Sequence, residues 1–441
     1  MTHTPTTSLL TLDPRTKKRN AAETRFRAYG LGAIGFGIAM LGLLLVTILS
    51  NGLGAFQQSF ITLQVPLLEA KLDKSGTREL DNIKKISTFG YAPILKKAMG
   101  DVLIRQGVES DLKSKKLVAL LSKSAPADLR NYVLANPEMI GETVEFTFLT
   151  NARVDGYLKG RVTRESIADD KSINTDQLDV VDALKAAGVI EKRFNIQFIT
   201  GADASDQRPE AAGIGVAMMG SFFMMVVVLA LALPIGVAAS IYLEEFAPKN
   251  WITDVIEVNI SNLAAVPSIV FGILGLAVFI NYMHLPQSAP LVGGLVLTLM
   301  TLPTIIISTR AALKSVPPSI RDAALGVGAS KMQSVFHHVL PLAAPGILTG
   351  TIIGLAQALG ETAPLLLIGM IGFVASNAPD SVASGFLDPN SAMPAQIYEW
   401  AKRADPAFYE RAWGGIIILL VFLVTMNTVA VLLRRRFERR W

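Results

Sequence analysis

The chain has 441 residues and a formal net charge of +5; 51% of its residues are hydrophobic and only 17% are charged. Its mean hydropathy of +0.43 exceeds that of soluble domains, so a polytopic membrane protein is the first class to test. The absence of cysteine excludes disulfides and cysteine metal sites, and the four histidines lack the ligand spacing of a zinc enzyme.

Six apolar segments are long enough to cross a bilayer, which needs roughly 20 residues. They are 28–50, 213–243, 259–283, 288–309, 346–372 and 413–433. The first is too long for the apolar core of a cleaved signal peptide, and no clear small-residue cleavage site follows it. We therefore expect an all-α membrane protein with six transmembrane helices.

Basic residues indicate the orientation of these segments, because lysine and arginine favour cytoplasmic flanks. They gather before the first segment, after the last, and between the fourth and fifth. Only 244–258 departs from this pattern, with four acidic residues against Lys249. The pattern predicts that both termini are cytoplasmic and that residues 51–210 lie outside.

Residues 51–210 hold 22 basic and 22 acidic residues, which predicts a separate water-facing domain. Alternation predicts strands at 60–68 and 194–200, and helical spacing predicts helices at 92–108 and 111–123. An α+β fold is therefore expected. No phosphate loop, nucleophile elbow or placed acid pair is present, which favours a structural or interaction role over catalysis.

Residues 319–347, between the fourth and fifth segments, predict two short helices joined by glycines. The prolines at 317–318 suit a first helical turn, Gly326 and Gly328 end that helix, Ser330 caps a second, and Pro341 stops it. From the residues alone, an ordinary interfacial hairpin is as good an interpretation as a docking site.

This segment resembles the coupling loop of binding-protein-dependent ABC permeases, whose pattern begins Glu-Ala-Ala and ends Leu-Pro. The matching residues are Asp322, Ala323, Ala324, Gly328, Leu340 and Pro341. Asp322 replaces the family's glutamate, and His338 stands where isoleucine is usual. The resemblance implies that a cytoplasmic ATPase subunit docks here, with the small side chains at 323 and 324 allowing a close approach.

A wider resemblance covers roughly 211–433. The quoted pieces are "LPIGVAASIYLEEFAPKN" (233–250), "NLAAVPSIVFGILGLAVF" (262–279), "TRAALKSVP" (309–317) and "GETAP" (360–364). Together they resemble the A-type membrane subunit of the bacterial phosphate-specific ABC transporter. Residues 51–210 resemble the enlarged N-terminal region of some proteobacterial members.

The resemblance implies a MetI-like type I importer permease in the bacterial inner membrane, moving phosphate into the cytoplasm. Its implied partners are a homologous C-type permease subunit, a dimer of ATP-binding subunits and a periplasmic phosphate-binding protein. The chain has no G-x-x-x-x-G-K-[ST] loop, so it should bind no cofactor itself, and ATP should be bound by its partner.

These inferences divide the chain into five parts. They are a cytoplasmic N-terminus (1–27), a first transmembrane helix (28–50), a periplasmic insert (51–210), a permease domain (211–433) containing the coupling loop 317–341, and a cytoplasmic tail (434–441).

Glu361 is the one ionisable residue within the six segments, and such residues usually face a cavity or a partner. We expect it to line the substrate pathway with Thr362 and Gln357, and to orient an arginine that binds the anion. In many related permeases an arginine occupies the position of Gln357, so the arginine should be Arg310 or belong to the partner permease. A buried structural ion pair and a protonated, hydrogen-bonding Glu361 remain alternatives.

Three glycines recur every four residues along the fifth segment, at Gly346, Gly350 and Gly354. Small residues at this spacing allow helices to approach closely, so we expect plain helix packing there rather than gating.

Three other functions compete with phosphate import. A permease for sulfate, molybdate or phosphonate would share the fold. A membrane sensor would need a cytoplasmic signalling module, and the longest internal cytoplasmic segment, 310–345, is too short for one. A membrane enzyme would need several polar residues converging within the segments.

Overall fold

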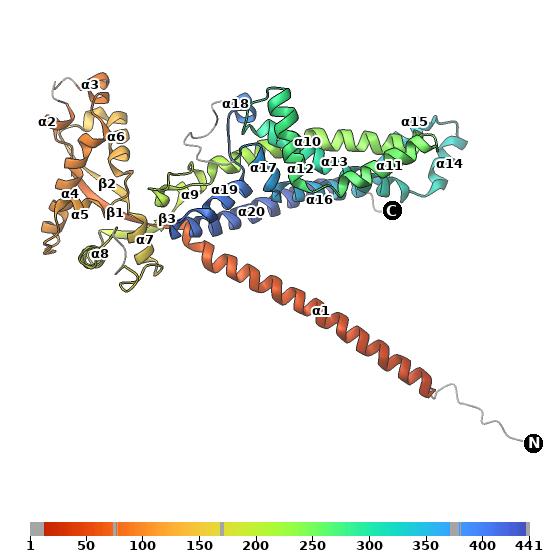
Figure 1. Ribbon diagram of the computed structural model, residues 1–441, viewed down its shortest axis with the longest axis horizontal. Coiled ribbons are helices and arrows are strands. Elements are labelled where there is room, and N and C mark those ends of the chain that lie inside the picture. The colour runs from red at the N-terminus through yellow and green to blue at the C-terminus, as the bar shows by residue number, and fades with distance from the viewer. Residues whose placement is uncertain are drawn as a thin grey trace, which may run out of the picture. The chain divides into compact units, whose positions relative to one another are not determined.

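The computed structural model describes residues 13–73, 76, 78–167, 172–370, 379 and 381–437. The chain divides into two compact units, residues 1–51 and 52–441. The first consists of the helix α1 (Pro14–Gly52), which is 39 residues long and contains the apolar segment predicted at 28–50. The second holds all other elements (Figure 1).

The insert is built on a three-stranded antiparallel sheet of order β2-β1-β3 (Figure 1). The strands are β1 (Gln57–Pro66), β2 (Thr143–Leu149) and β3 (Ile190–Phe194), and Ile61 of β1 pairs with Phe148 of β2 and Ile190 of β3. Alternate residues of β1 are buried, which directs one of its faces into the core of the insert.

Short helices complete the insert around this core. They are α2 (Glu69–Leu72), α3 (Leu80–Lys84), α4 (Ala92–Arg105), α5 (Ser114–Val118), α6 (Ala125–Ala135), α7 (Ala152–Leu158) and α8 (Thr175–Ala186), with 3-10 turns at Leu53–Phe56, Thr88–Tyr91 and Pro137–Met139. The predicted α+β character, the strand at 60–68 and the helix at 92–108 are confirmed, whereas the helix expected at 111–123 is only α5.

The strand predicted at 194–200 is wrong. β3 ends at Phe194, and residues Ile196–Thr200 form the helix α9. The side chain of Asn195 accepts a hydrogen bond from the N–H of Phe198, which caps this helix and ends the strand. Phe198 is then buried in the core of the permease rather than in that of the insert.

Four long helices form the body of the part that follows the insert: α10 (Gly215–Ile241), α13 (Pro290–Lys314), α16 (Leu340–Gly360) and α20 (Pro406–Phe437). α13 packs against both α10 and α16, and α16 also contacts α20 (Figure 1). The shorter elements are η4 (Pro209–Ala211), α11 (Trp251–Ala264), α12 (Ser268–Leu274), α17 (Ala363–Leu367), α18 (Val382–Leu387) and α19 (Met393–Lys402).

The predicted span at 259–283 is not a straight helix. α11 ends at Ala264, α12 begins at Ser268 and continues through a π-helical stretch to Tyr282, and the two parts are bent by 103°. Pro267 lies in the break, where proline cannot donate a backbone hydrogen bond and disfavours a helical residue before it. The described residues thus hold five helices long and apolar enough to cross a membrane, and a sixth span if this pair is counted.

The predicted span at 346–372 also differs. The helical segment starts at Lys331, passes through a π-helical turn at Val335–Val339, and ends at Gly360. The prediction that Pro341 stops the second helix of the loop is therefore wrong. Pro341 lies in the first turn of α16, where its missing N–H donor is tolerated. Residues 371 and 372 lie outside the described residues.

Candidate functional sites: a coupling loop, a half-buried glutamate and a buried charge junction

The loop after α13 forms the two short helices that its sequence predicts. α14 (Pro318–Gly326) starts after Pro317, and α15 (Lys331–Ser334) starts after Ser330. The Ser330 hydroxyl accepts the N–H of Gln333, and the Gln333 side chain accepts the N–H of Ser330, which is a capping box. Gly328 has φ +90°, a conformation that disfavours other residues and turns the chain sharply between the helices.

The exposed face of α14 is not the one expected from the motif. Asp322 and Ala323 are exposed, but Ala324 is only 6% exposed and faces its own chain. The idea that both alanines admit a partner's groove is therefore wrong for Ala324. Leu325 and Val327 are exposed as well, Val327 to 86%, so the surface open to a partner has an apolar part beside Asp322.

The second half of the loop is anchored by a small apolar core. Leu340 is partly buried against the cluster that contains Leu313, Val335 and Val339. Pro341 is exposed. This core fixes the loop to the end of α13 and to the start of α16.

A bidentate ion pair ties α14 to the π-helical turn (Tyr242–Phe246) that continues α10. Arg321 Nη2 lies 2.6 Å from Glu245 Oε1, and Arg321 Nε lies 3.1 Å from the same atom. The guanidinium also donates to the carbonyl oxygens of Leu313 and Val316, at 2.9 and 2.8 Å. It thereby adds a donor to the Leu313 carbonyl, which also accepts the N–H of Val316 at 3.3 Å, and pairs the Val316 carbonyl just beyond α13. One side chain thus joins α10, α13 and α14.

A second ion cluster lies at the same end of the helices. Arg310 Nη2 lies 2.5 Å from Glu257 of α11, and its Nε lies 3.4 Å from Glu244. Lys314 lies 3.6 Å from Glu244. With Glu245, these contacts explain why 244–258 departs from the positive-inside pattern: its acidic residues neutralise cations of the neighbouring loop.

Glu361 follows the last residue of α16, and its backbone is extended (φ −76°, ψ 130°). Between Gly360 and Pro364 the backbone is irregular, because Glu361 and Thr362 belong to neither α16 nor α17. Glu361 and Thr362 are half-buried, and Gln357, one turn earlier, is exposed. These three residues therefore lie together at the end of α16.

The register of α16 on α13 gives the depth of Glu361. A Cβ at Gly346 would lie 2.7 Å from Ala312, and one at Gly350 would overlap the Ser308 hydroxyl. Continuing this antiparallel register places Glu361 level with the residues near Leu297, roughly 10 Å inside the first residue of α13. Glu361 therefore lies at a helix end near one side of the bundle, not in the middle of a helix.

Arg310 is not the partner of Glu361. Its ion pairs are with Glu244 and Glu257, and it lies thirteen residues, or about 20 Å, along α13 from the level of Glu361. In the described part of the chain, no lysine or arginine lies within ion-pair distance of Glu361. The structure thus brings together Glu361, Thr362 and Gln357 and places Arg310 in the charge cluster at the other end.

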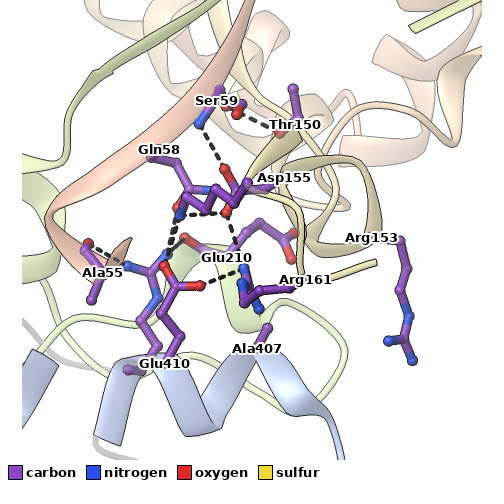
Figure 2. Close-up of polar contacts among 12 residues, drawn as sticks. Ala55, Gln58, Ser59, Thr150, Arg153, Asp155, Arg161, Glu210, Ala407 and Glu410 are labelled. Atoms are coloured by element: carbon purple, nitrogen blue, oxygen red, sulfur yellow. Dashed lines mark hydrogen bonds and ion pairs between the residues drawn. The ribbon is translucent and has the colours of Figure 1, made fainter. Parts of the chain in front are cut away.

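A buried charge junction, defined here by Gln58, Asp155, Lys159, Arg161, Glu210, Glu410 and Arg411, joins the insert to α20 (Figure 2). Arg411 is 3% exposed. It donates to the carbonyl oxygens of Ala55 (2.9 Å) and Glu210 (3.0 Å) and to the Gln58 side chain (2.5 Å).

Two cations of the insert cross this junction. Lys159 lies 2.6 Å from Asp155 and 2.8 Å from Glu410 of α20. Arg161 lies 2.5 Å from Glu410 (Figure 2). Asp155 also accepts the N–H of Ser59 in β1 at 2.9 Å. Because paired buried charges are costly to separate, the insert is held firmly to the start of α20.

Two further contacts extend this attachment. Glu210 accepts a hydrogen bond from Ser122 at 2.5 Å, and burial raises the pKa of the Glu210 carboxyl. Asp203 pairs with Arg403 at 2.5 Å and accepts the indole N–H of Trp400 at 2.8 Å. The segment between the insert and α10 is thereby fixed to α19.

Sequence reasoning missed the charge junction and the role of Arg321. The residues of the junction are far apart in the sequence, and none forms a motif. For Arg321 a signal existed, because the acidic residues of 244–258 needed cations on the same side of the membrane.

Residues 232–441 match the family described as "binding-protein-dependent transport system inner membrane component", and residues 13–168 match a domain of unknown function, DUF3333. The "phosphate transport system permease protein PstA" of Mycobacterium leprae is 31% identical over 52% of this chain and 73% of its own length. The "probable ABC transporter permease protein YqgI" of Bacillus subtilis is 34% identical over 54% of this chain and 82% of its own. A solved structure of the inward-facing MetNI methionine ABC transporter is 16% identical, with a TM-score of 0.40 over 51% of this chain and 97% of that one.

Proposed function

The chain belongs to the PstA-type permeases, binding-protein-dependent inner-membrane components of phosphate ABC importers, and we propose how its residues couple phosphate import to ATP hydrolysis. It is a multi-pass permease subunit rather than an enzyme. As a member of this family it works with ATP-binding subunits and a substrate-binding protein.

The finer assembly is part of the proposal. The chain pairs with a homologous C-type permease, a dimer of ATP-binding subunits docks on the cytoplasmic side, and a phosphate-binding protein docks outside. Both termini are cytoplasmic. The charge pattern supports this orientation, since the basic flanks and the loop 317–341 share one side.

The ATP-binding subunit docks on α14 through the exposed apolar face of Leu325 and Val327. Arg321 transmits its movement, because this side chain ties α14 to α10 through Glu245 and to the end of α13. Arg310 extends the connection to the bent α11 through Glu257. The loop and three helices then move as one body, as rocking of the spans requires.

Glu361, Thr362 and Gln357 line the phosphate pathway. The exposed face of α16 that carries Gln357 is open in the single chain, which suits a surface completed by the C-type permease. A carboxylate repels phosphate, so Glu361 orients a cationic ligand. Since Arg310 is engaged elsewhere, that arginine comes from the partner permease.

Uptake by the reconstituted transporter tests the substrate. Proteoliposomes containing the chain, its partner permease, the ATP-binding subunits and the phosphate-binding protein should accumulate labelled phosphate only with internal ATP. Excess unlabelled phosphate should abolish the signal, and sulfate, molybdate or phosphonate should not. ATP-driven accumulation of one of these other anions in place of phosphate would identify the alternative permease.

Glu361→Gln tests the pathway. Because the variant keeps the size and hydrogen-bonding capacity of the side chain but loses its charge, the complex should assemble and bind ATP normally while phosphate uptake falls severely. Thr349→Ser, a conservative change in the preceding helix α16, serves as the control. Uptake at the unmodified level, at equal membrane abundance, would leave Glu361 a structural role only.

A further inference from the structure

The corner between β3 and α9 exposes a compact apolar patch, which we define as Leu53, Phe194 and Ile196. These side chains are 56%, 61% and 66% exposed. The chain segments that carry them are adjacent, since Phe56 stacks on Phe194 with ring centroids 6.5 Å apart and accepts the N–H of Asn195 through its carbonyl oxygen. Exposed apolar groups gathered in this way indicate an interaction surface.

Packing against α20 gives the depth of this patch. The uncharged stretch 413–433 begins at Trp413 and ends before Arg434, and at helical rise it is about 31 Å long, close to the roughly 30 Å of a hydrocarbon core. Trp413 therefore lies at the outer boundary of the bilayer, where tryptophan is enriched.

The β3–α9 corner lies at the same outer boundary of the bilayer. A Cβ at Gly414 would lie 2.9 Å from the ring of Phe198 in α9, and a Cβ at Gly52 would lie 2.8 Å from the carbonyl oxygen of Trp413. The buried ring of Phe198 is thus level with the first residues of the span. Ile196 lies two residues before Phe198 in α9, so its exposed side chain is at interfacial depth.

We propose that this patch inserts into the outer leaflet of the membrane and anchors the insert at the lipid surface. The occupant is lipid rather than protein because the contacts of Phe198 and Gly52 with the first residues of the span place the patch at the boundary of the bilayer. Lys192, two residues before Phe194, is exposed and suits the phosphate groups of lipid headgroups, whereas the exposed Arg193 is paired with Glu191 at 3.1 Å. β3 is an edge strand, and insertion of its end also protects that edge.

This anchor complements the buried charge junction. The junction holds the insert to the start of α20 on one side, and the patch supports it on lipid at the β3–α9 corner. Together they fix the tilt of the insert over the membrane.

The absence of native cysteine allows a direct test. In the fully assembled, reconstituted transporter, Ile196→Cys is labelled with an environment-sensitive fluorophore. Leu53→Cys is a second position in the patch. The matched control is Phe89→Cys, whose side chain is 88% exposed in the turn before α4.

Labels at 196 and 53 should be quenched by nitroxides carried near the headgroup end of the lipid chains, and poorly by iodide in the buffer. The label at 89 should show the reverse. Quenching at 196 by iodide alone would overturn the proposal in favour of a water-exposed patch. Protection from both quenchers would overturn it in favour of a protein interface. Either result would leave phosphate uptake, and hence the proposed function, unaffected.

Discussion

Replacing Arg321 by alanine should uncouple ATP hydrolysis from phosphate uptake. The Arg321 guanidinium holds α14 to Glu245 in the turn that continues α10, to the Leu313 carbonyl in α13 and to the Val316 carbonyl just after α13. Without it, α14 keeps only its apolar contacts with the rest of the chain. Docking of the ATP-binding subunit would then move α14 without moving the helices.

The structure sets the size of this effect. Glu245 is only 7% exposed at its side chain, and removing one partner of a buried pair costs about 3–5 kcal/mol. The Arg321 side chain is 22% exposed, so water relieves part of this cost. We therefore expect the attachment of α14 to the helices to weaken by about 3 kcal/mol. This corresponds to roughly a hundredfold loss in the ratio of attached to detached loop.

The assay measures ATP hydrolysis and phosphate uptake on the same proteoliposomes. Arg321→Ala should retain hydrolysis stimulated by the phosphate-binding protein and lose most of the uptake per ATP. Lys314→Ala is the control, because it also removes a nearby positive charge. The Lys314 side chain is 60% exposed and its ion pair with Glu244 is 3.6 Å long, so coupling should barely change. An unchanged ratio of phosphate uptake to ATP hydrolysis in Arg321→Ala would refute the proposal that Arg321 couples α14 to the helices.

Three other substitutions test the packing and the charge junction. Arg411→Met should lower the free energy of unfolding by about 3–5 kcal/mol, measured by thermal unfolding, because three buried acceptors lose their donor. A loss below about 1 kcal/mol, as expected for an exposed ion pair, would show that the junction is dispensable. The folded state binds the proton of Glu210 more tightly than the unfolded state, so the unmodified protein should gain stability as pH falls from the raised pKa of Glu210 towards the ordinary value. Glu210→Gln should abolish this gain. A difference in melting temperature between the variant and the unmodified protein that stays constant with pH would contradict this. Gly350→Ala should lower the free energy of unfolding by about 1–3 kcal/mol, because the new Cβ overlaps Ser308. Gly354→Ala is the control, since its Cβ meets Ile305 at an ordinary 3.5 Å. Equal melting temperatures for the two variants would exclude close packing at Gly350.

The sequence predicts those features of the fold that depend on neighbouring residues. Helical periodicity and caps located α4, α14 and the N-cap at Ser330, because the signals and the structures they specify lie within one or two turns. The alternation of residues 143–149 would likewise have predicted β2. Local signals also misled: residues 194–200 alternate like a strand, but the cap at Asn195 and the burial of Phe198 against α20 form a helix instead.

The features that the sequence did not predict are set by distant contacts. Pairing of Arg310 with Glu257 and of Arg411 with Gln58 joins residues 53 and 353 positions apart, and no pattern in one sequence records such partners. Glu361, Thr362 and Gln357 lie close together, and their role in the pathway stays a prediction. The predicted span ran past Glu361, because the end of α16 at Gly360 depends on the break before α17.

Cross-linking from the tip of the coupling loop tests most directly that a cytoplasmic ATPase drives this permease through residues 317–341. Val327→Cys introduces a single, highly exposed thiol at the end of α14 in a chain without cysteine. A cleavable thiol-to-amine linker should join this position to the ATP-binding subunit and stop phosphate uptake, and cleavage of the linker should restore it. Failure to form an adduct in an assembled, transporting complex would contradict the account, as would full uptake by the cross-linked complex.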